Sequence, residues 1–255
     1  MAAIVRQLGR TDDEIAEWEL RCDMAAVFRV AARLDWNEQI GNHNSVMLPG
    51  SPDRPLFLIN PRGMLFQEIT ASSLIVVDYD GRVVRGEGVV RPVAFHIHAP
   101  IHKARPDARC VLHLHPPHTT ALSLIDNGRL ALAHHNNLIV NDRVAYDDAM
   151  TGPAGGLEEG FRLAEALGDK TVMVMANHGI LSVGPTVADA FHELLVVEQT
   201  CQYQLMAMWT GQQLRRQPDA LRWNYRGTWS DKLEGRFLLD AWRRVLDREE
   251  PGYRA

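Results

Sequence analysis

Cysteine is scarce in this chain of 255 residues. The three cysteines, Cys22, Cys110 and Cys201, are odd in number and lie far apart. This spacing excludes a disulfide framework and a zinc knuckle of the CxxC type, which need paired or closely spaced cysteines. We therefore expect the three side chains to be buried as small hydrophobic groups.

Long apolar runs and an excess of positive charge are also missing. No stretch of about 18 apolar residues occurs, which argues against a transmembrane helix, and the first residues, MAAIVRQLGRTDDE, lack the apolar core of a signal peptide. Lys and Arg number 27 against 32 Asp and Glu, a net charge of −5, which argues against a nucleic-acid-binding surface. We expect a cytoplasmic protein with neither a membrane nor a nucleic-acid partner.

Repeats, low-complexity tracts and linkers are absent as well. The hydrophobic fraction of 46% and the charged fraction of 23% are ordinary for a globular protein. We expect one domain over residues 1–255, in which residues 211–255 form a C-terminal helical extension.

Helical and strand patterns are mixed along the chain. A capping box of Thr11 and Glu14 predicts a helix start, and Asp80-Gly81 between two β-rich runs predicts a hairpin. Residue patterns predict helices over 11–34, 92–104 (with Pro100 as a kink or early stop), 156–167, 186–209 and 230–248, and strands over 45–48, 55–60, 74–78, 82–85, 110–115 and 171–175, the last continuing through 180–183. The fold class is α+β, with a single core sheet covered by helices.

Histidine is the residue type that is out of proportion. Of 11 histidines, a cluster falls in one stretch, at His96, His98, His102, His113, His115, His118, His134 and His135. Imidazole is the commonest transition-metal ligand and the commonest acid or base near neutral pH. The composition therefore points to this stretch as the functional one.

The run Cys110-Val-Leu-His113-Leu-His115 places two histidines on one face of a predicted strand. Imidazoles about 7 Å apart along a strand can converge on one ion. His178 is a candidate third ligand, because it follows an apolar strand and precedes Gly179, where the backbone can turn sharply. Three histidines with an open position are typical of a catalytic zinc, iron or manganese site.

Two longer motifs resemble a known family. HLHPPHTTALS after RPDARCV, and MANHGILSVG further on, are similar to the class II aldolase and adducin family, with support from NHNS, INPRG and EITASSL. The resemblance spans roughly residues 15–210. It implies a three-layer αβα fold with a central, mainly antiparallel sheet. It also implies a homo-oligomer, most often a tetramer, with sites at subunit interfaces, and one divalent metal ion (Zn, Mn or Fe) per subunit on His113, His115 and His178.

The chain departs from the sugar-phosphate aldolases of this family at their acid/base residue. In the aldolases this carboxylate stands eleven positions before the arginine of the RPDA motif, and in this chain that position is occupied by Ala94. Two phosphate-binding serines precede it in the aldolases, and Pro92 and Val93 occupy their positions here. A standard sugar-phosphate aldolase or epimerase is therefore not expected.

Other residues then become candidates for the chemistry. His98 and His102 share a helix face, His118 follows the predicted metal strand, and His135 (with His134) falls where the aldolases place a tyrosine that enters the neighbouring subunit's site. Arginine suits bidentate binding of a carboxylate. The predicted substrate-binding residues are Arg62, Gly63, Arg91, Ser45 and Asn60. Glu68 is expected to be a surface or capping residue.

Four hypotheses stay open. A metal-dependent carboxy-lyase for a small hydroxylated aromatic or an oxo- or hydroxy-dicarboxylate fits the missing base, because decarboxylation needs an electron sink and a proton donor but no C–H deprotonation. The others are an aldolase or dehydratase for a non-phosphorylated substrate, a ferrous oxygenase, and a non-catalytic assembly domain like the adducin head.

Overall fold

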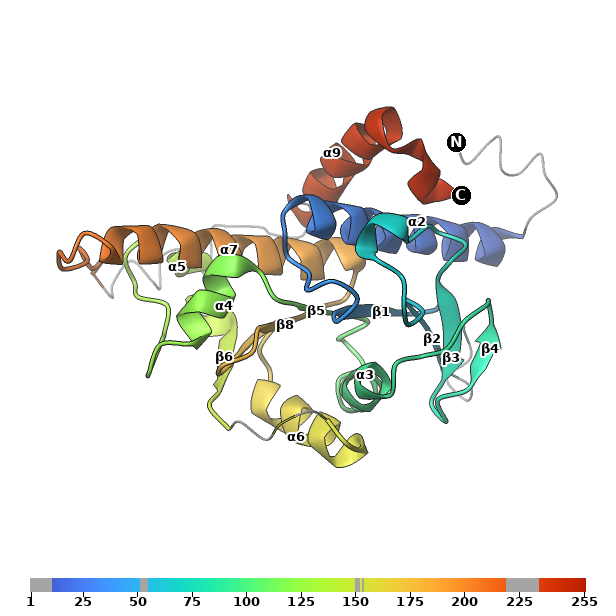
Figure 1. The fold of residues 1–255 in the computed structure, drawn as a ribbon, viewed down its shortest axis with the longest axis horizontal. Coiled ribbons are helices and arrows are strands. Elements are labelled where there is room, and N and C mark those ends of the chain that lie inside the picture. The colour runs from blue at the N-terminus through green and yellow to red at the C-terminus, as the bar shows by residue number, and fades with distance from the viewer. Residues whose placement is uncertain (1–10, 51–54, 150–151, 153, 219–233) are drawn as a thin grey trace.

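A central sheet of eight strands organises the computed structural model (Figure 1), which describes residues 11–50, 55–149, 152, 154–218 and 234–255. The strand order is β4-β3-β2-β1-β5-β8-β7-β6. Neighbouring strands are antiparallel throughout, except that β6 and β7 are parallel. The strands are β1 (His43–Met47), β2 (Leu56–Ile59), β3 (Ile75–Asp78), β4 (Val83–Arg85), β5 (Cys110–Leu114), β6 (Val144–Asp147), β7 (Val172–Met175) and β8 (Ile180–Gly184).

Helices cover both faces of the sheet (Figure 1). On one face lie α2 and α7, with the short α4 and α5 beside α7 and with α9 packed on the outer side of α2 and α7; on the other face lie α3 and α6. The helices are α2 (Asp12–Arg33), α3 (Pro92–Ala104), α4 (Pro117–Ser123), α5 (Asn137–Val140), α6 (Leu157–Leu167), α7 (Val187–Met208) and α9 (Glu234–Glu249), with single turns η1 (Phe66–Glu68), η2 (Asn141–Arg143) and η3 (Pro251–Arg254). The expected three-layer αβα fold with a mainly antiparallel sheet is confirmed.

The apolar residues of β5 explain why the sheet is buried on both sides. Leu112 and Leu114 belong to the large core under α2 and α7, whereas Val111 packs in a separate core under α3 and α6. Because side chains alternate along a strand, His113 shares the α3 and α6 face with Val111. The histidine therefore projects from a strand that is fixed by two hydrophobic cores.

Local sequence signals account for several boundaries. The Thr11 hydroxyl accepts a hydrogen bond from Glu14 N, and the Glu14 carboxylate accepts one from Thr11 N at 2.8 Å, which completes the predicted capping box of α2. Gly81 has φ +80° between β3 and β4, as the predicted hairpin requires. Glu68 accepts a hydrogen bond from Leu65 N at the start of η1, a capping role as expected.

The elements differ from the expected ones at the β7–β8 turn and at the sheet edge, and α3 has no early stop at Pro100. Residues 180–183 do not continue the strand before them: β8 runs back antiparallel to β7. The helix expected over residues 92–104 is confirmed as α3, which continues through Pro100. Pro100 cannot donate to the His96 carbonyl, and this oxygen faces Gly160 of α6 so closely that a Cβ on Gly160 would lie 2.0 Å from it. Strand β6 at the sheet edge, which the apolar patterns did not predict, pairs in parallel with β7.

The C-terminal region packs on the N-terminal helix. Arg243 and Arg236 of α9 place guanidinium nitrogens 2.5 and 2.6 Å from the Asp23 carboxylate of α2. Of the helix expected over residues 230–248, residues 230–233 lie outside the described residues, and the rest belongs to α9. Among the described helices, none combines the length and the apolar character that crossing a bilayer requires.

Candidate metal centre

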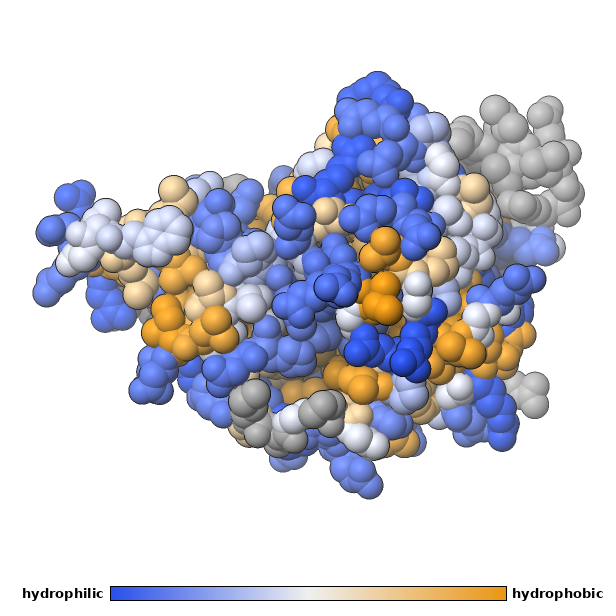
Figure 2. Space-filling model, viewed as in Figure 1, coloured by the Kyte–Doolittle hydropathy of each residue, from blue (hydrophilic) through white to orange (hydrophobic). Residues whose placement is uncertain are grey.

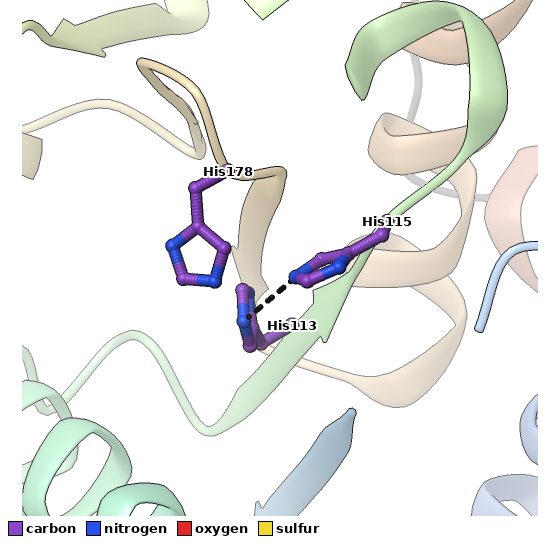
Figure 3. A group of neighbouring side chains, drawn as sticks. All are labelled: His113, His115 and His178. Carbon is purple, nitrogen blue, oxygen red and sulfur yellow. Dashed lines mark hydrogen bonds between the residues drawn. The ribbon is translucent and has the colours of Figure 1, made fainter. Parts of the chain in front are cut away.

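Three imidazoles meet where β5 ends and the β7–β8 turn begins (Figure 3). His113 lies on β5, His115 directly follows it, and His178 lies in the turn. Their ring centroids are 4.8 to 5.0 Å apart, and one ring nitrogen from each falls within 4.8 Å of the others. The structure thus brings together the three residues that the sequence pattern singled out.

A hydrogen bond of His113 directs its lone pair toward the space between the three rings, and His115 Nε2 lies close to it. His113 Nδ1 lies 3.1 Å from the carbonyl oxygen of Ile180, which can only accept, so Nδ1 carries the proton and Nε2 the lone pair. His115 Nδ1 lies 3.1 Å from a Glu38 carboxylate oxygen, within ion-pair distance although without hydrogen-bond geometry. His115 Nε2 is 3.4 Å from His113 Nε2. Without a metal, His115 Nε2 can donate a hydrogen bond to the lone pair of His113 Nε2 (Figure 3), whereas with His115 protonated on Nδ1 both Nε2 atoms offer lone pairs to the same space, so the donor set fits a metal ion.

Burial favours the form of the ligands that binds metal. It lowers the pKa of His113 well below its ordinary value, with further lowering from His43 and His178. It also lowers the pKa of His178. Neutral imidazole is the form that coordinates zinc, iron or manganese. Three histidines without a fourth protein donor, among the residues the structure describes, leave a position open for water or substrate.

The turn that carries His178 depends on two special residues. Asn177 adopts φ +56° and makes the reversal, whereas Gly179 does not have a left-handed φ. Gly179 is needed for space instead, because a Cβ there would lie 2.4 Å from His115 Cδ2 and 2.7 Å from the Leu114 carbonyl oxygen. The expectation that Gly179 provides the sharp turn is therefore wrong, and the close approach of His115 is the reason for the glycine.

A cavity of about 370 Å³ opens onto the three histidines. Its wall at the start of α3 is apolar, with Val93 and Ile97, and its polar lining includes Glu38, His43 and Arg91. A cluster of Asp147, Glu159 and Arg162 also borders it.

The two arginines that line the cavity differ in how their charge is balanced. Arg162 is paired with both Asp147 and Glu159, at 2.6 to 2.9 Å. Arg91 donates to the carbonyl oxygens of Gly41 and Ile40 at 2.8 and 3.3 Å, and no carboxylate of the described chain pairs with it. Its positive charge is therefore available to an anion in the cavity.

The remaining predicted substrate-binding residues are placed less directly. Arg62 lies in a second hollow that Arg91 and Glu38 also line. Gly63 has φ +96° in the turn after β2 and, like Asn60, lines neither hollow. The Asn60 amide is buried, accepting from Asn44 N at 3.2 Å and donating to Asn42 O at 3.3 Å, so it holds the start of β1.

The four histidines predicted as catalytic do not line the cavity in the described chain. His98 and His102 are fully or almost fully buried in α3, behind His43, and Ser45 bridges them. His118 bonds through Nδ1 to Glu198 of α7 at 2.7 Å. His135 stacks on His134 with a centroid separation of 5.5 Å. A role for His135 in a neighbouring subunit's site stays a prediction.

Two residues at the site were missed in the sequence. His43 pairs in register with His113 across β1 and β5, with ring centroids 4.9 Å apart. It lies in the NHNS motif two positions before Ser45, so in a strand the two side chains point to the same face. This period of two was the signal in the sequence that could have identified His43. Glu38 lies in the loop before β1, and no local pattern marks it.

These features describe a layered αβα protein with a three-histidine site at the middle of its sheet. Residues 22–205 match the family model described as the class II aldolase and adducin N-terminal domain. The chain belongs to the class II aldolase and adducin family.

Relatives support the assignment over most of the chain. A protein of Caulobacter vibrioides, named provisionally as a class 2 aldolase, is 40% identical over 243 residues, 93% of each chain. Human beta-adducin is 35% identical over 193 residues, which are 74% of this chain but 26% of the adducin.

Solved structures show the same architecture. An aldolase II superfamily protein from Pseudomonas syringae is similar with a TM-score of 0.87 and 34% identity, covering 98% of this chain and 99% of that one. L-fuculose 1-phosphate aldolase from Glaciozyma antarctica is similar with a TM-score of 0.83 and 25% identity, covering 96% of both chains.

Proposed function

We propose that this protein is a divalent-metal-dependent lyase that decarboxylates a small hydroxylated aromatic acid or an oxo- or hydroxy-dicarboxylate. The observation that carries the proposal is the guanidinium of Arg91, which lines the same cavity as the three histidines and pairs with no carboxylate of the described residues. An arginine without a carboxylate partner is suited to hold a substrate carboxylate in bidentate fashion.

The position of the missing base supports a reaction without C–H deprotonation. Ala94 is 1% exposed and packs with Phe57 and Ile59 in the core, so this position offers no acid or base to the cavity. Pro92 begins α3, and Val93 contributes an apolar surface where the sugar-phosphate aldolases bind phosphate. An apolar wall of this kind suits a ring or carbon chain better than a phosphate.

His113, His115 and His178 would hold the metal ion in this proposal. A bound divalent ion supplies a Lewis acid that withdraws electrons from a substrate oxygen. Arg91 orients the carboxylate group. Glu38, which borders the cavity beside His115, is the proposed proton donor, because His98 and His102 have no direct access to it.

Aldol cleavage or dehydration of a non-phosphorylated substrate is the second candidate. Glu38 favours it, since this side chain returns a carboxylate to the cavity despite Ala94. A general base contributes roughly 10²–10⁴-fold to such reactions.

The test is a CO₂-release assay over a panel of hydroxylated aromatic acids and oxo- and hydroxy-dicarboxylates, with Mn²⁺, Zn²⁺ or Fe²⁺ added. We expect CO₂ from at least one panel member, and loss of it in Arg91→Gln but not in Arg82→Gln, an exposed arginine in the β3–β4 turn. A carbonyl product without CO₂ would favour aldol cleavage, and oxygen consumption a ferrous oxygenase. A protein that binds no metal would favour the non-catalytic assembly role.

We also propose a homo-oligomer, with a tetramer as the expected size and the sites at its interfaces. The face in Figure 2 is largely hydrophilic, with apolar side chains in separate patches. Large apolar side chains are exposed near the end of α7, including Trp209 (79%) and Met206 (50%), and these suit burial against a second copy. An active monomer in light scattering would contradict the proposal.

A further inference from the structure

A continuous chain of side-chain hydrogen bonds leads from the cavity into the protein. His43 Nδ1 lies 2.8 Å from His98 Nε2, and His98 Nδ1 lies 2.5 Å from the Ser45 hydroxyl. The same hydroxyl is 2.8 Å from His102 Nε2, and His102 Nδ1 is 2.8 Å from the Ala108 carbonyl oxygen. The four side chains are between 0 and 3% exposed.

The far end of this chain sets the direction of every bond in it. A carbonyl oxygen only accepts, so His102 Nδ1 donates to Ala108 O and His102 Nε2 must accept from the Ser45 hydroxyl. The Ser45 oxygen, having donated its only proton, accepts from His98 Nδ1, which leaves His98 Nε2 as an acceptor.

The last bond fixes the ring that faces the cavity. His43 Nδ1 must donate to His98 Nε2, so the proton of a neutral His43 is on Nδ1 and its Nε2 carries a lone pair. No hydrogen bond within the described chain engages that Nε2, and His43 lines the cavity.

These bond directions hold when all three imidazole rings are neutral, and the surroundings of the rings favour the neutral form. Burial lowers the pKa of His98 well below the ordinary value and that of His102 to about 4. In the described structure no carboxylate bonds to His43, His98 or His102, whereas His118 has Glu198. A proton added to any of them would be a buried charge without a counter-ion.

We propose that the chain from Ala108 to His43 holds an unprotonated Nε2 at the cavity wall, and that this atom accepts a hydrogen bond from a substrate hydroxyl. The ring centroids of His43 and His113 are 4.9 Å apart, so the imidazole that carries the acceptor Nε2 is next to the three-histidine cluster. The recognised hydroxyl is therefore next to the oxygen that chelates the metal. The substrate class is a carboxylate with two adjacent oxygen groups, at least one of them a hydroxyl.

In this arrangement Ser45, His98 and His102 are positioning residues, and His43 is the residue that touches substrate. The substrate class rests on the proposed function, which supplies the chelating carboxylate. Which ring nitrogen of His43 carries the proton can be measured without turnover.

The first test is nitrogen NMR of protein labelled with ¹⁵N-histidine, in the metal-free and zinc-loaded forms. We expect His43, assigned by loss of its signals in His43→Phe, to show a protonated Nδ1 and an unprotonated Nε2. Ser45→Ala removes the link that fixes His98, so the His43 Nε2 signal should move toward a mixture of tautomers. His96→Asn is the matched control, since His96 is also on α3 but bonds to Ala154 O outside the chain. A protonated Nε2 in the unmodified protein would overturn the proposal.

The second test measures binding to the zinc-loaded protein by calorimetry. The probes are 2,3-dihydroxybenzoate and 2-hydroxy-3-methoxybenzoate, which share the chelating groups and differ in the adjacent donor. We expect about 5- to 150-fold tighter binding of the dihydroxy compound, the ratio that corresponds to leaving a buried acceptor unpaired. The ratio should fall toward one in His43→Phe and decrease in Ser45→Ala. Equal affinities in the unmodified protein would refute the recognition. A preserved preference without CO₂ release would instead refute only the decarboxylase proposal.

Discussion

Replacing Gly179 with alanine tests the packing that brings the three histidines together. The added Cβ would lie 2.4 Å from His115 Cδ2 and 2.7 Å from the Leu114 carbonyl oxygen. The carbonyl belongs to β5, whose Leu114 pairs with Ile180 of β8, so it cannot move without loosening the centre of the sheet. The His115 ring is the softer partner and should be pushed away from His113 and His178.

Two effects of Gly179→Ala follow, each with an expected size. Overpacking of this kind costs about 1–3 kcal/mol, which lowers the melting temperature by about 2–12 °C in a domain of this length. Displacing a ligand from its orienting contacts weakens metal binding by roughly 10–100-fold.

The assay combines thermal unfolding of the metal-free protein with zinc titration. Gly252→Ala is the matched control, because no heavy atom lies within 4 Å of a Cβ there and its φ is not left-handed. Because the clash does not involve the ion, the loss of stability should be present without metal. A Gly179→Ala protein with unchanged melting temperature and zinc affinity would refute the packing argument.

Three further predictions address the metal, the buried acid and the pH response. His115→Ala should leave the fold largely intact but abolish stoichiometric metal in elemental analysis, and full occupancy would exclude this residue as a ligand. Glu198→Gln should lower the free energy of unfolding by about 1–3 kcal/mol in urea titrations, because the buried carboxylate accepts hydrogen bonds from His118 and Thr119 that one amide oxygen cannot all replace; unchanged stability would contradict this. Burial lowers the pKa of His102 from 6.5 to about 4, so between these values the unfolded chain binds more protons than the folded one. His102 alone should therefore contribute up to about 3 kcal/mol to the stability that the metal-free protein loses as the pH falls through this range. His102→Gln should make that part of the urea-midpoint profile less steep, and an unchanged profile would refute the assignment.

The sequence was sufficient where a local signal determines the structure. Thr11 with Glu14 indicated the start of α2, and Asp80-Gly81 indicated the β3–β4 hairpin, because capping and tight turns depend on residues within a few positions. The alternation of His113 and His115 was equally local. Their convergence with His178 was predicted from the position of His178 after an apolar strand and before Gly179, and from the family resemblance.

The parts that could not be predicted depend on register between distant segments. His43 reaches His113 only because β1 pairs with β5, and the loop that carries Glu38 reaches His115 only after the sheet has formed. The burial of His98 and His102 likewise depends on which face of α3 meets β1. A helix-face argument could show that these two share a side but not whether that side faces the cavity.

The pairing of β1 with β5 joins two parts of the sequence at the centre of the sheet, and both parts contribute residues to the site. In the sheet order, β1 to β4 form one side and β5 to β8 the other, joined only through the β1–β5 pairing. The three candidate metal ligands all come after that crossing in the chain, whereas His43 and Arg91 come before it. Substitutions in the first hundred residues can therefore change the cavity wall around His43 and Arg91 without altering the three candidate ligands, whereas substitutions at Asp147, Glu159 or Arg162 alter the cavity from the part of the chain that also carries the ligands.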